Sequence, residues 1–145
     1  MQPESQVLGF LVHGVVSEER LLESLSRVLG LPPGEVTRFD LDSPCLAAVL
    51  VQRVLRPAGF RTDLTLYVDA SRVGGGSGLT SEEVATRVSA ELGEEVLVSP
   101  PADDPAVQVT WFLITPEGKR FRVSEVLLGD EEYSVDIDRA SLRPL

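Results

Sequence analysis

The stretch that decides the fold is VLGFLVHGVVSEERLLESLSRVLG, residues 7–30. Its first part, residues 7–16, is apolar at nearly every position, which predicts a central strand buried in a sheet. A helix then begins at Ser17 and ends at Gly30. Its buried stripe recurs at helical spacing and comprises Leu21, Leu22, Leu25, Val28 and Leu29. A buried strand that leads directly into an amphipathic helix indicates a domain of mixed α and β structure.

A second amphipathic helix is predicted over residues 80–92. Thr80 and Glu83 have the spacing of a capping box, in which each side chain binds the other residue's amide. The helix ends at a glycine, and its buried stripe comprises Val84, Ala85, Val88 and Leu92. Both helices share Ser-Glu-Glu, then Leu-Gly, then Glu-Val, so the chain contains a faint internal repeat. Each repeat would be a strand-helix-strand-strand unit, with halves at 6–58 and 61–128; duplication and a chance likeness of two helices both stay open.

Runs of alternating or apolar residues predict the remaining strands. These strands are expected at residues 35–41, 61–69, 95–99, 107–115 and 119–127. Residues 44–56 are ambiguous between strand and helix, but three valines favour a strand that forms a hairpin with residues 61–69. We therefore predict an α+β fold, with a mostly antiparallel sheet and two helices packed on one face.

The length and charge of the chain limit what it binds. At 145 residues it is predicted to be a single domain, 1–145, with an acidic C-terminal tail at 129–145. Its net charge is −10, from 23 acidic and 13 basic residues. That charge disfavours nucleic acid and anionic membranes, which need a positive surface, and it suits a basic protein partner. Residues 125–138 hold six acidic residues and no basic one, which we interpret either as a solvated edge or as a docking surface.

The expected location is the cytoplasm. No apolar run approaches the ~20 residues that span a bilayer, and the N-terminus has no basic region typical of a signal peptide. The single cysteine, Cys45, forms no internal disulfide and is predicted to be a buried thiol.

Few side chains suit catalysis or metal binding. His13 is the only histidine, so neither it nor Cys45 has a predicted partner as base, nucleophile or zinc ligand. Asp103-Asp104 and the acidic run at 130–132 lack the alternating ligands and central glycine of an EF-hand loop. We therefore predict that the protein is not an enzyme and uses no cofactor or metal.

A glycine cluster at residues 74–78 precedes the second helix. It lacks the Lys-Ser/Thr of a Walker loop and the third glycine of a dinucleotide fingerprint. With Arg72 followed by Gly75, it partly resembles the acyl-CoA pyrophosphate loop of GNAT acetyltransferases, although Ser77 departs from that pattern. That resemblance implies an acetyltransferase that uses residues 72–78. The helix N-terminus, however, is predicted to be capped and carries two glutamates, so we expect a connector that binds no anion.

The second half of the chain resembles the small acidic immunity proteins that bacteria keep beside secreted polymorphic toxins. The resemblance lies in the acidic Pro-Pro-Ala-Asp-Asp-Pro loop, the hairpin Trp-Phe-Leu-Ile-Thr-Pro-Glu-Gly-Lys-Arg-Phe-Arg-Val and the acidic tail. It implies non-enzymatic inhibition, in which the protein covers the active site of a cognate toxin with an acidic surface. The partner-binding residues would be Asp103, Asp104, Trp111, Asp130, Glu131 and Glu132.

Two alternatives stay open for this half. Trp111 lies in a hairpin with Phe112 and Phe121, so it is either a core residue or an exposed interface anchor. The repeat is also similar to that of gyrase-inhibitor-like sensors of small molecules, which are built from two strand-helix-strand-strand units. That resemblance would imply a ligand cleft between two equivalent halves.

Overall fold

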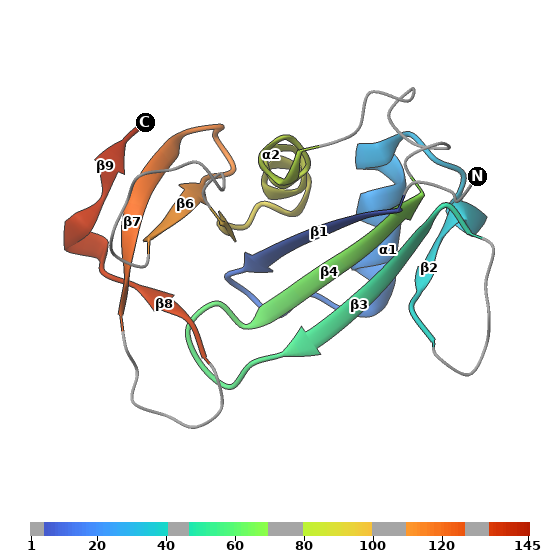
Figure 1. Ribbon diagram of the computed structural model, residues 1–145, viewed down its shortest axis with the longest axis horizontal. Coiled ribbons are helices and arrows are strands. Elements are labelled where there is room, and N and C mark those ends of the chain that lie inside the picture. Colours follow the sequence, from blue (N-terminus) through green and yellow to red (C-terminus); the bar gives the residue numbers. More distant parts are fainter. Residues whose placement is uncertain (1–4, 41–46, 70–79, 100–109, 127–133) are drawn as a thin grey trace.

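One sheet of nine strands carries two helices in the computed structural model, which describes residues 5–40, 47–69, 80–99, 110–126 and 134–145 (Figure 1). The helices are α1 (Glu18–Leu29) and α2 (Ser81–Leu92). The strands are β1 (Ser5–Val12), β2 (Val36–Arg38), β3 (Val49–Leu55), β4 (Thr62–Asp69), β5 (Val96–Val98), β6 (Thr110–Ile114), β7 (Arg120–Val126), β8 (Asp136–Ile137) and β9 (Arg143–Pro144). The predicted α+β class, with a mostly antiparallel sheet, is confirmed.

The strand order is β2-β3-β4-β1-β5-β6-β7-β8, and β9 pairs with β7. Among these strands only β2 and β3 run parallel. At the centre, β4 lies between β1 and β3, while β1 lies between β4 and β5. The chain therefore makes two interleaved crossovers, β1-α1-β3 and β4-α2-β5, which is the split βαβ connectivity of ferredoxin-like sheets.

The two helices of the predicted repeat begin and end alike, whereas the strands that follow them pair differently. Ser17 Oγ accepts a hydrogen bond from the Arg20 amide at 3.2 Å, and Thr80 Oγ1 accepts one from the Glu83 amide at 3.1 Å. Both helices end at a glycine with φ 67°. However, β5 pairs with central β1, whereas β2 lies at the edge of the sheet beside β3. β3 pairs with β4 along seven residue pairs, so β2 lies at the edge of the sheet. The arrangement that the two helices share is therefore strand-helix-strand, β1-α1-β3 and β4-α2-β5.

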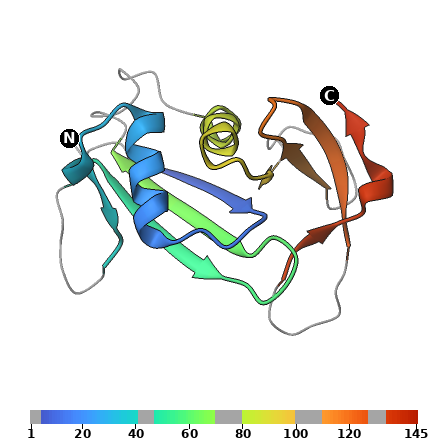
Figure 2. The same cartoon turned by 180° about the vertical axis from the view of Figure 1, so that it is seen from behind.

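The prediction that β1 is buried throughout is wrong on one face. Leu8 and Phe10 are buried, but Val7 is 60 % exposed and Gly9 is also exposed. Both helices lie on the face to which Leu8 and Phe10 belong, so neither helix of the described residues covers the opposite face of β1, β4 and β3. Figure 1 looks onto that face with α1 behind the strands, and Figure 2 shows α1 in front of them.

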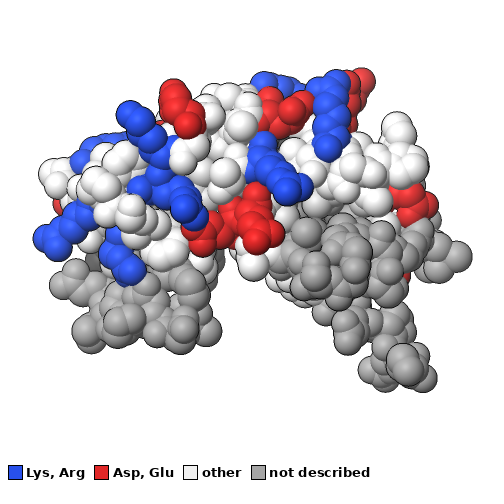
Figure 3. Space-filling model, turned by 90° about the horizontal axis from the view of Figure 1, so that it is seen from above, with Lys and Arg blue, Asp and Glu red and all other residues white. Residues whose placement is uncertain are grey.

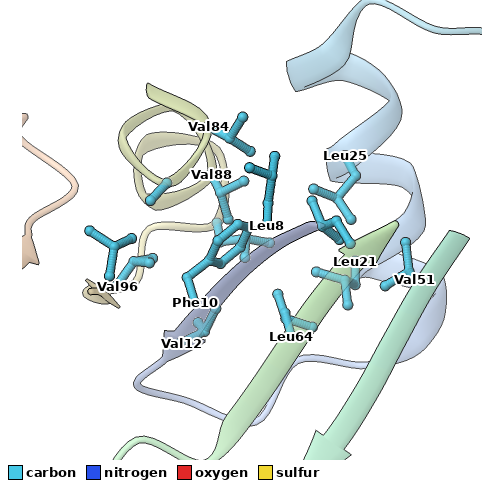
Figure 4. Close-up of a cluster of buried hydrophobic side chains, with 14 of the residues drawn as sticks. Leu8, Phe10, Val12, Leu21, Leu25, Val51, Leu64, Val84, Val88 and Val96 are labelled. Carbon is cyan, nitrogen blue, oxygen red and sulfur yellow. The ribbon is translucent and has the colours of Figure 1, made fainter. Parts of the chain in front are cut away.

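Two hydrophobic cores lie on opposite faces of the sheet. The first fills the space between the helices and the strands (Figure 4) and includes Leu8, Phe10, Leu21, Leu25, Leu64, Val84, Val88 and Val96. The second comprises Leu11, Phe60, Leu97, Leu113, Val123 and Ile137. Burial of these apolar side chains is the main stabilising contribution to the fold.

The C-terminal segment completes the second core. β8 pairs with β7, and the Phe60 amide donates to the Val135 carbonyl at 2.8 Å in the turn between β3 and β4. Gly59 bridges Val135 and has φ +67°, and a Cβ on Gly59 would lie 2.1 Å from the Val135 oxygen. Only glycine fits this turn without displacing the backbone of the C-terminal segment.

Candidate functional site

Trp111 is the one predicted site residue within the described part of the chain. It follows the first residue of β6 and is half-buried, packed against the second core. Its indole Nε1 donates a hydrogen bond to Glu125 Oε1 on the neighbouring strand β7 at 3.1 Å. Trp111 is therefore neither a fully buried core residue nor a fully exposed anchor, since one side packs on the core and the rest remains accessible.

A cleft of about 260 Å³ adjoins Trp111. Its lining includes the apolar side chains of Leu11 and Val135 and, from the sheet face opposite the helices, Gly9 and Thr65. The charged residues of the lining are Arg56 and Asp63, and Arg56 Nη2 forms an ion pair with Asp63 Oδ2 at 2.7 Å. This mixture of an aromatic side, apolar surface and a few polar groups is typical of sites that receive a side chain or small group of a partner.

The topology brings the ends of both acidic segments to this cleft. Ser99, which lines the cleft, is the last described residue before segment 100–109, and that segment returns to the residue before Trp111. Segment 127–133 leaves the end of β7 and returns beside Val135, which also lines the cleft. The predicted site residues Asp103, Asp104, Asp130, Glu131 and Glu132 lie outside the described residues.

The described surface is much closer to neutral than the whole chain. Outside it lie one basic residue, Arg72, and seven acidic residues, Glu4, Asp42, Asp103, Asp104, Asp130, Glu131 and Glu132. The described part thus holds 12 of the 13 basic and 16 of the 23 acidic side chains. Figure 3 shows these charges interspersed over one face. Most of the net charge of −10 therefore belongs to segments outside the described residues.

Of the two residues considered for catalysis, only His13 lies within the described residues. His13 lies just after β1, exposed, with its ring edge-on to Phe60 at 5.0 Å between centroids. Cys45 lies outside the described residues. Within the described ranges, no three His, Cys, Asp or Glu side chains are grouped so that they could hold a metal ion.

The N-terminus of α2 borders a larger cavity of about 910 Å³, but its charges do not favour an anion. Thr80 already accepts the Glu83 amide, and Glu82 forms an ion pair with Arg120. Two glutamates thus stand in the first turn, where a pyrophosphate would need free amides and positive charge. The glycine cluster at 74–78 and Arg72 lie outside the described residues, so the acetyltransferase alternative remains a prediction.

The sequence did not indicate the other residues of the cleft. Arg56 directly follows β3, Asp63 lies in β4, and Val135 comes from the C-terminal segment. Gly9 alone carried a signal, because a glycine in the middle of a central strand often marks a close approach of another group.

Comparison with known proteins adds no relative. No protein-family model, curated protein or solved structure matches the chain. Neither helix of the described part has the length and apolar character needed to cross a bilayer. The fold and the cleft thus define a helix-covered α+β domain with an aromatic cleft, and the likeness to immunity proteins remains a prediction.

Proposed function

We propose that the protein is a non-enzymatic binding module for a basic protein partner, which docks over the Trp111 cleft. The observation that carries this proposal is that one acidic segment starts directly after Ser99 and the other ends two residues before Val135, and both of these residues line the cleft. Trp111 would act as the central anchor, since half-buried tryptophans are enriched among residues that dominate binding energy. The acidic segments would steer a basic partner toward it and speed association.

Within this class, the specific proposal is an immunity protein that neutralises a cognate bacterial toxin in the cytoplasm by covering its active site. Its support is the sequence resemblance together with charge complementarity, because nuclease toxins have basic clefts. The proposed contacts are Asp103, Asp104, Trp111, Asp130, Glu131 and Glu132. No covalent chemistry is required of the chain.

The test is a pull-down from the native host with the tagged protein, at low salt and again at about 0.5 M salt, where exposed charges are strongly screened. We expect one stoichiometric, basic partner that is lost at the higher salt. Absence of a partner under both conditions would count against the proposal.

Matched variants locate the contact. Asp103→Asn with Asp104→Asn, and separately Trp111→Ala, should each weaken the purified complex by about tenfold or more. The control is Glu19→Gln with Glu117→Gln, which removes the same charge from exposed positions on α1 and in the turn before β7. If the control weakens binding as much as the Asp103/Asp104 pair, general charge attraction explains the complex and the cleft does not.

A further inference from the structure

The Trp111 cleft has room for an inserted group, and Gly9 provides part of that room. Gly9 lies within β1, is exposed and lines the cleft. It is outside the set of glycines with positive φ, so its backbone conformation is open to any residue. A Cβ on Gly9 would meet only the Leu64 carbonyl, at an ordinary 3.8 Å. Glycine within a strand costs stability, and here the missing side chain enlarges the cleft.

Small residues continue this space from β4 toward β6. Thr65 pairs with Gly9 on one side, and the strand register places Ser99 level with Gly9 and Trp111 on the other. The floor of the cleft therefore consists of small residues and ends at the indole of Trp111. The cleft volume of about 260 Å³ is below the roughly 300 to 1,000 Å³ of pockets for small-molecule ligands, so it suits a single side chain.

The charges around the cleft favour a cation. Asp63 accepts Arg56 Nη2 through Oδ2, and within the described residues its other oxygen, Oδ1, has no hydrogen-bond donor. The side chains of Arg56 and Asp63 are only 26 % and 28 % exposed, so water screens them incompletely. Glu125 holds a second carboxylate at the edge of the Trp111 indole. Two negative groups of the described chain thus stand against one positive group, beside an aromatic ring that also attracts cations.

We propose that the cleft receives one arginine side chain of the basic partner, so this inference rests on the proposed function. In this arrangement the guanidinium lies against the indole of Trp111 and donates to Asp63 Oδ1. The aliphatic part of the inserted side chain covers Leu11 and Val135. Arginine is favoured over lysine because its planar, weakly hydrated guanidinium stacks on aromatic rings and presents several donors. A neutral apolar group would cover Asp63 Oδ1 without supplying a donor.

Arg56 limits the strength of this contact. It is a like charge beside the inserted guanidinium, and it occupies one oxygen of Asp63. Removing it frees Oδ2 and makes the cleft more negative, so an arginine should bind more tightly. A purely structural role predicts the opposite, because loss of either member of the ion pair would then disturb the cleft alike.

A nuclear magnetic resonance titration of the isotope-labelled full chain with the tripeptide acetyl-Gly-Arg-Gly-amide tests the proposal. A single side chain should bind with a dissociation constant on the order of 10 mM, so the titration extends to about 50 mM at constant ionic strength. We expect shifts of the Gly9 and Ser99 amides and of the Trp111 indole N–H. The matched tripeptide with citrulline, which keeps the shape without the charge, should bind about tenfold or more weakly. The lysine tripeptide should bind about threefold more weakly.

Four variants locate the contact. Asp63→Asn should weaken binding of the arginine tripeptide by about fivefold or more, and so should Gly9→Val, which fills the cleft with a residue suited to strands. Arg56→Gln should strengthen binding by about threefold. Glu19→Gln is the control, since it removes one negative charge at an exposed position of α1 and should leave binding unchanged. Circular dichroism melts establish that each variant is folded at the temperature of the titration.

Three results would overturn the proposal: equal binding of the arginine and citrulline tripeptides, no shift at the highest concentration, or weaker binding by Arg56→Gln. The proposed function can fail separately. A captured basic protein that binds Asp63→Asn as tightly as wild type would leave the binding module standing and overturn the arginine contact. Tripeptide binding in the cleft without any captured basic protein would support the arginine contact and count against the proposed function.

Discussion

Arg139 holds Glu95 through two hydrogen bonds, from Nη1 to Oε2 at 2.8 Å and from Nη2 to Oε1 at 2.7 Å. Glu95 immediately precedes β5, and Arg139 begins the 3-10 helix Arg139–Ser141 after β8. The pair therefore ties the C-terminal segment to the middle of the sheet. Paired donors on a planar guanidinium fix both the distance and the angle of this contact.

This pair should make stability depend on acid pH. The hydrogen bonds from Arg139 lower the pKa of Glu95 below its ordinary value of 4.5, and the nearby positive charge adds to the effect. A lowered folded-state pKa contributes stability above pH 4.5, and that contribution is lost as the pH falls through the folded-state pKa. Glu95→Gln should therefore cost about 1 kcal/mol at pH 7, a modest amount because the pair is partly exposed, and less at pH 3.

Urea denaturation of both proteins at the two pH values measures this difference. Glu23→Gln is the control, since Glu23 pairs with Arg27 on the exposed side of α1, where each side chain is 61 % exposed. It should change the free energy of unfolding by less than about 0.5 kcal/mol. An equal loss from Glu95→Gln at pH 7 and pH 3 would contradict the assignment.

Three glycine-to-alanine substitutions should separate backbone strain from steric clash. Gly34 has neither a positive φ nor a neighbour within 4 Å, so Gly34→Ala should change stability by less than about 0.5 kcal/mol. Gly30 has φ +67° but open space, so Gly30→Ala should cost about 1 kcal/mol. Gly59 has both the same φ and a clash with Val135, and Gly59→Ala should cost about 3 kcal/mol. Thermal melts that place Gly30→Ala and Gly59→Ala together would show that the contact with Val135 is unimportant.

Thr62 should be intolerant of losing its hydroxyl. The side chain is fully buried, accepts a hydrogen bond from the Val16 amide at 3.1 Å and donates one to the Gly14 carbonyl at 2.6 Å. Thr62→Val keeps the shape but leaves both backbone groups without this partner, so it should cost about 2 to 3 kcal/mol. Thr62→Ser, which keeps the hydroxyl, should recover most of that loss. Thr65→Val, on the face of β4 opposite the helices, is the control and should leave the free energy of unfolding in urea nearly unchanged. A well-tolerated Thr62→Val would mean that water replaces the hydroxyl.

Trp111 should report partner binding by its own fluorescence, because it is the only tryptophan in the chain. Covering its accessible side with a partner removes water from the indole, so the emission should shift to the blue and acrylamide should quench it less. A partner that binds with no change in Trp111 emission would place the contact elsewhere on the molecule.

Local sequence patterns predicted local structure well, while pairing between distant strands was beyond them. The caps at Ser17 and Thr80 depend on residues three positions apart, so the helix boundaries follow directly from the sequence. The place of β2 depends on which strand pairs with β4. β3 does so along seven residue pairs, whereas β2 pairs with β3 along three, and no local pattern in the sequence encodes this choice. The apolar run in β1 likewise did not reveal that one face lacks a helix.

The cleft could be predicted only in part. Trp111 could be predicted as a binding residue from its residue type. Gly9, Asp63 and Val135, which come from distant parts of the chain, could not be predicted to line the same cleft. Their meeting depends on the antiparallel pairing of β1 with β4 and on the bridge between Val135 and Gly59. Such convergence is a property of the whole topology, so composition and spacing cannot identify it.

The late position of Val135 and Ile137 in the chain sets an order of events during synthesis. The first core draws on residues between Leu8 and Ile114, so a growing chain can bury it before the C-terminal segment has left the ribosome. The second core needs Ile137 and gains Leu142, which are made after every residue of the first core. Trp111 packs against that second core. The nascent protein can therefore form its helix-covered half first, and the cleft becomes complete only after Val135 has followed.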